Sequence, residues 1–576
     1  MATSEADNEL RRHVEGRLIG LRTNRYSWWT HARELADYIL PRRYKWLITP
    51  NQMARGSPIN QHILDSTGTL AARNLASGLV SGVSSPTRPW LKLKINRIDS
   101  TQTSPISLWL GECERLLYLI FQESNFYNSI ATLYFDLVVF GTGVMFIYED
   151  FENVIHCYNP CFGEYYIDLD GHYRPTICYR EFTMTVSAVV DEFGLENCSP
   201  AVQGLYKDGG AGLTRELVVA HALEPNVGKR TYGVSSQFKF RECYWEWGGS
   251  AAPQGGAAYA QGFLRKRGYH EQPNICVRWD LVSNDAYGRS PGMDALPDIK
   301  QLQQEVRRKG QAIDKTVNPP MEADIQLKNQ PASLLPGGIT YTAGLMQSGN
   351  PGFRSVYGNW KPGIAEISED LQEIRDRIKR TFFNDILQTA SQYETRSNVT
   401  AVEWDMRKSE SLVMLGPVLQ RIYDEGLKVV VERVFAMAAR AGILPPAPRE
   451  VQGAAINIEF ISMLAQAQAA ASTSGIERLL QVVGNLVGVD PSVMDNIDVD
   501  FATNKYSALM NNDPRIIRAP QQVADIRAQR QQQQQMMQLA QQAETAEKLA
   551  GGAKTLSETN VGGGQNAMQA MLGAGA

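Results

Sequence analysis

The stretch at residues 288–292 has the G-x-S-x-G pattern of a hydrolase nucleophile elbow, with Ser290 in the place of the nucleophile. In that motif the backbone N–H of the residue after the serine helps to bind the oxyanion. Here that residue is Pro291, which has no N–H group. Serine is a favoured helix N-cap, and proline is favoured at the first helical position. We therefore predict that Ser290 begins a helix, and a hydrolase is the least favoured of the functions considered.

A second possible catalytic motif is Asp65-Ser66-Thr67-Gly68, which is similar to the Asp-Ser/Thr-Gly of aspartic proteases but has one residue too many. That chemistry needs two carboxylates that share a site, and no convincing second copy exists. A turn or helix cap before a helical segment at 64–79 is the preferred interpretation.

Possible metal ligands are few and poorly spaced. His156, Cys157 and Cys161 have no second matching pair, so buried thiols are favoured over zinc. Asp168 and Asp170 could open a calcium loop, but no further ligand follows at the required spacing, and a hairpin turn is favoured. The sequence has no Gly-x4-Gly-Lys-Ser/Thr loop, so the chain is not an ATP-driven motor. We expect no metal, no cofactor and no enzymatic activity.

Basic side chains gather on two segments with helical periodicity. The first segment carries Arg307, Arg308, Lys309 and Lys315, and the second carries Arg375, Arg377, Lys379 and Arg380. Interleaved acidic residues cancel part of this charge; they are Glu305, Asp314, Glu373 and Asp376. For any single basic residue a solvated face or a subunit-to-subunit ion pair is favoured over direct contact with DNA phosphates. As a set they are candidates for contact with DNA.

Composition limits the class of protein. A chain of 576 residues is too long for one hydrophobic core, and 43% hydrophobic with 20% charged residues is typical of folded proteins. The formal net charge of -4 argues against a repressor or histone-like protein that grips DNA phosphates. It is compatible with a conduit, because tight binding would stop DNA from sliding. The seven cysteines and a polar N-terminus without a signal sequence favour a reducing cytoplasmic origin with free thiols, and no stretch is apolar enough to predict a membrane span.

The periodicity of apolar residues predicts an α+β fold that is mainly helical. We expect helices at 9–40 and 64–79, β structure at 130–185 and 215–280, and hairpin turns at Gly141-Thr142-Gly143 and at 168–171. Two strong helices follow, at 291–317 with Pro297 in its first turn or at a kink, and at 365–387. A helix at 400–440, kinked at Gly416-Pro417, comes next, and further helices are expected at 465–487 and 519–549. Residues 551–576 are expected to be disordered.

Several short stretches, taken in their order along the chain, resemble the head-to-tail connecting, or portal, protein family of short-tailed bacteriophages. They are residues 36–41, 65–68, 75–79, 85–90, 140–143, 287–291 and 398–403, which read ADYILP, DSTG, LASGL, SPTRPW, FGTG, YGRSP and NVTAVE. Their order and spacing fit from about residue 10 to 445. Beyond about 450 the resemblance is compositional.

The resemblance implies a division of the chain into parts. These are a wing at 1–290, stem helices at 291–317 and 365–387, a clip at 318–364, a tunnel loop at 388–399, a kinked spine helix of the wing at 400–445, a crown at 446–512, a C-terminal barrel helix at 513–550, and the tail. It also implies a ring, usually a dodecamer, at one capsid vertex of the virion, assembled in the host cytoplasm. Double-stranded DNA would pass through the ring without being read. The tunnel-loop candidates for contact with DNA are Tyr393, Arg396 and Asn398.

The partners that the resemblance implies are the terminase large subunit, then a tail adaptor, and the major capsid and scaffolding proteins. A different class remains as the alternative: a tail adaptor or an internal virion structural protein, with the Gln-rich C-terminal region as a coiled-coil interaction module. The helix–clip–helix arrangement at 291–387 favours the portal over the adaptor.

Overall fold

The computed structural model describes residues 5–41, 43, 62–95, 105–226, 234, 237–247, 262–319, 321–323, 353–355, 363–384, 415–448, 456–460, 475–485, 498–509, 518 and 520–558. The chain divides into two compact units. The first comprises Met1–Lys92, Glu114–Pro445 and Ile458–Gln468, and the second comprises Leu93–Cys113, Pro446–Asn457 and Ala469–Ala576.

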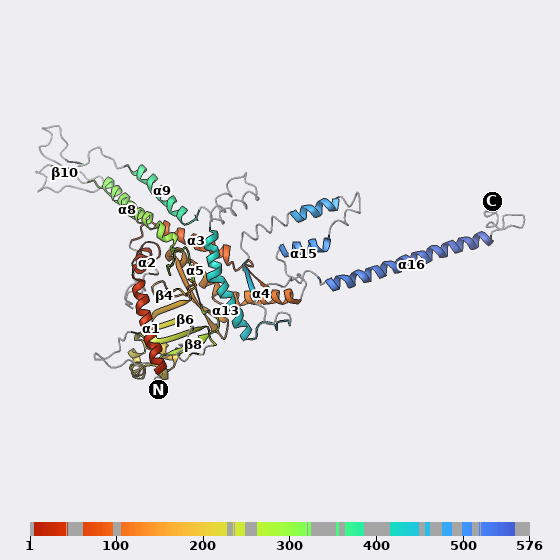
Figure 1. The fold of residues 1–576 in the computed structure, drawn as a ribbon. Helices are drawn as coiled ribbons and strands as arrows, with labels where there is room; N and C mark the ends of the chain where they lie inside the picture. Colours follow the sequence, from red (N-terminus) through yellow and green to blue (C-terminus); the bar gives the residue numbers. More distant parts are fainter. Residues whose placement is uncertain are drawn as a thin grey trace. The chain divides into compact units, whose positions relative to one another are not determined.

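The largest sheet of the first unit has five antiparallel strands in the order β4-β5-β6-β7-β8. The strands are β4 (Tyr165–Asp168), β5 (Ile177–Thr185), β6 (Glu216–Pro225), β7 (Phe240–Glu246) and β8 (Arg265–Tyr269). Successive side chains of a strand point to opposite faces, and each face is covered by helices (Figure 1). Helix α1 (Glu5–Asn24) packs on one face, against Ala220 and Ala222. Helices α6 (Val186–Phe193) and α7 (Pro200–Asp208) pack on the other, against Leu217 and Val219.

A buried carboxylate also ties α1 to this sheet. Glu224 of β6 accepts hydrogen bonds from Arg17 of α1 at 3.0 Å, from Tyr179 Oη at 2.9 Å and from Arg241 Nε at 2.7 Å. Burial alone would raise the pKa of Glu224, but hydrogen bonding by His13 and the charge of Arg241 outweigh it and lower the pKa to about 2. The carboxylate is therefore held ionised inside the fold.

A three-stranded antiparallel sheet, in the order β3-β2-β9, joins this region to further helices. Its strands are β2 (Thr142–Asp150), β3 (Val154–Tyr158) and β9 (Asn274–Arg278). Helix α5 (Phe126–Phe140) runs directly into β2 through Gly141, which has a left-handed backbone (φ 75°). A side chain at that position would be strained and would overlap the backbone of Gly288, so only glycine fits this corner. Helix α3 (Thr67–Val83) packs against α5.

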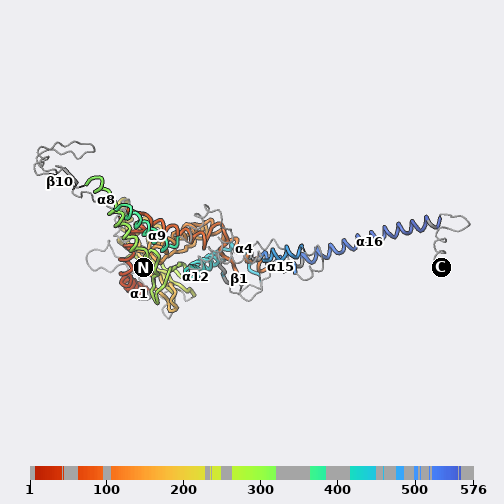
Figure 2. Tube along the Cα trace, turned by 90° about the horizontal axis from the view of Figure 1, so that it is seen from above, coloured from red at the N-terminus to blue at the C-terminus, as the bar shows by residue number. Residues whose placement is uncertain are grey.

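An antiparallel pair of long helices, α8 (Pro291–Val317) and α9 (Ile364–Thr381), completes the first unit with α2 (Tyr26–Tyr38) and a last helical segment. Both views show α8 and α9 side by side, extending away from the sheets (Figures 1 and 2). Strands β10 (Met321–Ala323) and β11 (Phe353–Ser355) pair antiparallel between them in the sequence. The last segment comprises α12 (Gly416–Arg421), the π-helical η8 (Ile422–Leu427) and α13 (Lys428–Arg440).

The second unit holds the C-terminal helices. Helix α4 (Pro105–Glu123) begins in it, and β1 (Leu91–Ile95) pairs with β12 (Ile456–Phe460). Residues 475–485 are helical, followed by α15 (Val499–Leu509) and α16 (Pro520–Glu558). Arg527 of α16 makes two 2.8 Å hydrogen bonds to Asp500 of α15. The side chains described on α16 are exposed almost throughout, so this long helix has no core of its own.

Several predictions of secondary structure are confirmed and several are wrong. The helix predicted at 9–40 is two helices, because the chain turns at Arg25, whose side chain is buried among aromatic rings such as Phe162 and Tyr287. The β structure predicted from residue 130 begins only at Thr142. Residues 126–140 form α5, in which the β-branched Val138 and Val139 are buried by helix packing, which overrides their strand preference.

The predicted hairpin at residues 141–143 is instead the corner between α5 and β2. Helices α4, α6 and α7 were not predicted. Pro297 lies beyond the first turn of α8, and the helix continues through it. The tail predicted to be disordered from residue 551 is helical as far as Glu558, because two glycines cost only about 1 kcal/mol each in a helix of strong formers. Residues 559–576 lie outside the described part.

Within the described residues, no helix is both long and apolar enough to cross a membrane. All seven cysteines lie in the described part and none forms a disulfide, as the sequence predicts.

Candidate functional site

The antiparallel pair α8–α9 carries most of the basic residues singled out in the sequence. Two polar contacts fix the register of the pair: Lys309 Nζ donates to Ser368 Oγ at 2.8 Å, and Arg377 Nη2 donates to Asp298 Oδ1 at 3.3 Å. Helix α9 buries an apolar stripe formed by Leu371, Ile374 and Ile378, and it packs against both α8 and α3. On α8 no described residue beyond Gln303 is buried, so its second half is mostly open to solvent.

The N-cap of α8 shows which of the two interpretations of the G-x-S-x-G pattern is correct. The hydroxyl oxygen of Ser290 accepts the backbone N–H of Met293 at 3.0 Å, and the hydroxyl donates to the carbonyl of Val139 at 2.7 Å. Pro291 occupies the first turn, and Ser290 is 1% exposed. Both hydrogen-bonding functions of the hydroxyl are used and the side chain is covered. The prediction of a helix start is confirmed, and Ser290 has no access to a substrate.

A polar clasp joins α8 and α9 at the segment before α3. The side-chain carbonyl of the buried Gln303 of α8 accepts the backbone N–H groups of Leu64 and Asp65 at 2.7 and 2.8 Å. The carboxylate of Asp65 accepts two hydrogen bonds from Arg375 of α9, at 2.8 and 3.0 Å, and one from the N–H of Thr67 at 2.8 Å. Burial would raise the pKa of Asp65, but the bonds from Thr67 and Arg375 prevail and lower it. Of the predicted turn or helix cap, the turn is confirmed: Asp65 accepts from Thr67 two residues later, while Ser66 is the N-cap of α3 and makes no side-chain cap bond. The same carboxylate also anchors the helix pair.

The basic candidates do not form one cluster. Arg375 is committed to the clasp, and Lys379 donates to Asp376 at 3.1 Å. Lys309 lies between the two helices. The exposed candidates are Arg307, Arg308, Lys315 and Arg380. Tyr393, Arg396 and Asn398 lie outside the described residues.

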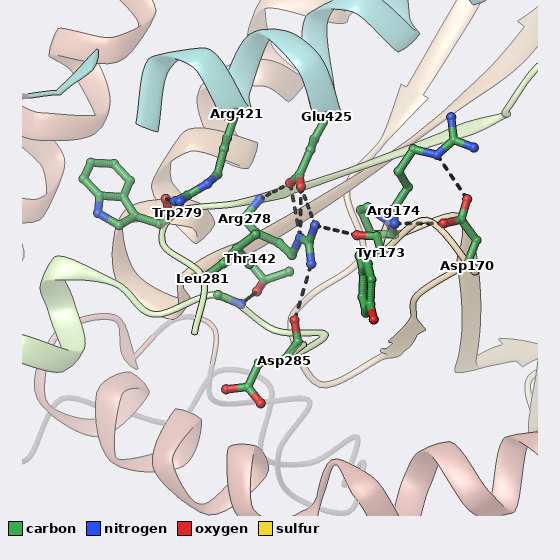
Figure 3. Close-up of polar contacts among 12 residues, drawn as sticks. Thr142, Asp170, Tyr173, Arg174, Arg278, Trp279, Leu281, Asp285, Arg421 and Glu425 are labelled. Atoms are coloured by element: carbon green, nitrogen blue, oxygen red, sulfur yellow. Dashed lines mark hydrogen bonds and ion pairs between the residues drawn. The ribbon is translucent and has the colours of Figure 1, made fainter. Parts of the chain in front are cut away.

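A buried arginine that the sequence did not single out connects β9 to the segments around it (Figure 3). The Arg278 side chain is 3% exposed, and its Nε donates to Glu425 Oε1 of η8 at 3.1 Å. Its backbone N–H donates to the same carboxylate at 3.0 Å, and its Nη atoms donate to the carbonyls of Tyr173 and Asp285 at 3.2 and 3.4 Å. One side chain thus holds together β9, η8, the turn after β4 and the loop before α8.

The neighbouring Trp279 contacts a residue just after the end of α9 and the last residue of α12. Its ring centroid is 6.3 Å from that of Phe383, just after α9, and its carbonyl accepts a 2.7 Å hydrogen bond from Arg421 of α12. Gly426 of η8 approaches β9 so closely that an added Cβ would lie 2.8 Å from Val277. The described irregularity in this helical segment is therefore η8, whereas Pro417, where a kink was predicted, lies in the first turn of α12. Residues 400–414 lie outside the described part.

The sequence carries no signal for these contacts, because Arg278 and Glu425 lie 147 positions apart.

The structure also places the residues that were considered as possible zinc and calcium ligands. On β3, His156 is exposed and Cys157 is buried, so they point to opposite faces of the strand. The carboxylate of Asp170 accepts the backbone N–H groups of His172 and Arg174, as in the predicted turn. Within the described residues, no group of three or more His, Cys, Asp or Glu side chains could hold a metal ion.

The described part of the chain thus combines an α+β fold with a long antiparallel helix pair. Residues 11–517 match the family model described as "Bacteriophage head to tail connecting protein", and the chain belongs to this family. It is similar to a "Probable portal protein" of Bordetella phage BPP-1, with 38% identity over 88% of this chain and 89% of that protein. It is also similar to the "Portal protein" of Salmonella phage epsilon15, with 36% identity over 97% of this chain and 96% of that protein. These matches identify the head–tail connector, or portal, function and confirm the family predicted from the sequence.

Proposed function

We propose that copies of this chain form a ring, a dodecamer, at one capsid vertex of a short-tailed phage, and that double-stranded DNA enters and leaves through its channel. The observation that carries this proposal is the near full-length match to the portal protein of phage epsilon15, which leaves no large part of either chain unaccounted for. Portal proteins form oligomeric rings that connect capsid and tail. A ring of identical subunits closes through one repeated heterologous contact.

The parts of the chain take the roles that the resemblance implies. Residues 1–290 and 400–445 form the wing and its spine, α8 and α9 form the stem, and residues 318–364 form the clip. Residues 446–512 form the crown, and α16 contributes to a C-terminal barrel. The proposal for the stem is supported by the clasp at Asp65, which holds the two helices as one unit on the wing.

Passage of DNA is passive in this proposal. A net charge of -4 is unsuited to gripping phosphates along the whole surface, so DNA can slide. Because Arg375 and Lys379 are engaged within the chain, we place the contact with DNA on residues 388–399, with Tyr393, Arg396 and Asn398 as its candidates. Deletion of residues 391–396 should then impair DNA packaging and retention without changing assembly of the ring. Unchanged packaging and retention would refute this role.

The partners follow from this position at the capsid vertex. The clip is the proposed docking surface for the terminase large subunit and then for the tail adaptor, and the wing faces the major capsid and scaffolding proteins. The subunit works without enzymatic activity or cofactor, because the ATP-driven step belongs to the terminase. We place its assembly in the host cytoplasm.

Negative-stain electron microscopy of the purified protein, with its mass measured by light scattering, tests the ring. Annular particles with a central hole and the mass of a dodecamer are the expected result. A monomer or dimer that persists at every salt and protein concentration would refute the proposal.

A further inference from the structure

On the outer side of α8, basic residues outnumber the one acidic residue, Asp314, in the second half of the helix. Arg307, Arg308 and Lys315 are exposed, and none of them makes an ion pair with any described residue. At 100° per residue they lie roughly 100–160° around the helix from Lys309, which faces α9. They therefore point away from the intramolecular partner of α8.

The outer side of α9 is acidic in its first half. Glu366, Glu369, Asp370 and Glu373 are all exposed. They lie roughly 70–170° around the helix from the middle of the buried stripe of Leu371, Ile374 and Ile378, and Glu373 also lies 3.7 Å from Arg377 of the same helix. The helix pair thus has a basic edge, Arg307, Arg308 and Lys315, and an acidic edge, formed by these four carboxylates, on its two opposite sides.

Arg307 and Arg308 also lie at the level of the acidic edge along the pair, whereas Lys315 lies beyond the start of α9. The contacts 309–368 and 298–377 place residues 307 and 308 of α8 opposite residues 368–370 of α9 in the antiparallel register. A rotation about an axis parallel to the helices keeps this level unchanged. It therefore carries the acidic edge of one copy to the height of the basic edge of the next.

We propose that the basic edge of α8 binds the acidic edge of α9 of a neighbouring copy, and that this charge-complementary contact joins the stems around the ring. The proposal rests on the proposed function in requiring a ring, and it assigns Arg307 and Arg308 to the subunit contact and not to DNA. Opposite charges at matching heights fix the register of neighbours and oppose a displaced contact in which like charges meet.

Charge reversal of each edge tests the contact. At the level of the proposed contact, the variant Arg307→Glu/Arg308→Glu has acidic residues on both edges, and the variant Glu369→Lys/Asp370→Lys has basic residues on both edges. Each alone should lose the ring in light scattering and electron microscopy at about 50 mM salt, where surface charges are least screened. The variant with all four substitutions should regain it. A matched control, Arg12→Glu/Lys207→Glu, changes two exposed basic residues away from the stem and should keep the ring.

Mixing the two double variants distinguishes loss of the contact from misfolding of the chain. The two double variants, each unable to assemble alone, should form rings when mixed in equal amounts, because every acidic edge then meets a basic edge. Rings of either double variant alone, or failure of both the mixture and the fourfold variant, would overturn the contact while leaving the portal function standing. Loss of DNA packaging by intact Arg307→Glu/Arg308→Glu rings would place these arginines on DNA and would also overturn it. A wild-type chain without rings would overturn the proposed function as well.

Discussion

Removal of the carboxylate of Glu425 tests whether Arg278 holds η8 to β9 and the loops around it. In Glu425→Ala the guanidinium of Arg278, 3% exposed, loses its only charged partner among the described residues and stays buried. Breaking a buried ion pair from one side costs about 3–5 kcal/mol, whereas loss of an exposed pair costs about 1 kcal/mol or less. The loss here should be at the upper end, because the backbone N–H of residue 278 loses its acceptor too.

The assay must report on this region alone, because a chain of several units does not unfold in one step. Native-state hydrogen exchange of the β9 amides measures the free energy of local opening. We expect Glu425→Ala to lower it by about 3–5 kcal/mol and Glu425→Gln, which keeps an acceptor oxygen, by about 1–3 kcal/mol. The control Arg174→Ala breaks an ion pair in which the arginine is 67% exposed, and it should cost about 1 kcal/mol or less.

A double substitution sharpens the test. Replacing both partners, in Arg278→Met/Glu425→Leu, leaves no unpaired charge in the interior and should cost less than Glu425→Ala alone. If Glu425→Ala were no more damaging than Arg174→Ala, or if the double variant were the least stable of all, the reasoning about this buried pair would be refuted.

Three further outcomes follow from the fold. Gly141→Ala should destabilise the first unit by at least about 2 kcal/mol in thermal unfolding, because it places a side chain on a left-handed backbone and against neighbouring atoms. The control Gly16→Ala, with open space around residue 16, should be neutral or stabilising. Equal effects of the two substitutions would contradict this prediction. Glu224, with a pKa lowered to about 2 from an ordinary 4.5, adds stability that is complete above about pH 4.5 and is lost as the pH falls toward 2. Glu224→Gln should therefore lower stability at pH 7 by about 3 kcal/mol and flatten its decline between pH 5 and 3, and an unchanged profile would exclude the role. Ser290→Ala should cost about 1–2 kcal/mol through the lost cap, and any hydrolytic activity that it abolished would restore the enzyme hypothesis.

The sequence predicted those features that depend on local chemistry. The start of α8 follows from a serine before a proline, and the apolar spacing of α9 identifies its buried stripe. The turn at Asp65 was also predictable, because an aspartate side chain readily accepts a backbone N–H two residues later.

What the sequence could not predict depends on contacts between distant segments. Val138 and Val139 favour strands by themselves, and only their burial against other elements makes a helix of that segment. Likewise, neither the Arg278–Glu425 pair nor the approach of Gln303 to Asp65 leaves any local pattern. The sequence shows the charged residues on the two helices of the α8–α9 pair, but only the register of α8 and α9 shows that Arg307 and Arg308 lie at the height of the carboxylates.

The most direct test of the central claim is a cryo-electron microscopy reconstruction of the assembled protein, in which α8 and α9 can be located. The helix pairs should surround a central channel, with α8 of each copy against α9 of its neighbour. Helix pairs at the outer rim, or an assembly without a channel, would contradict it.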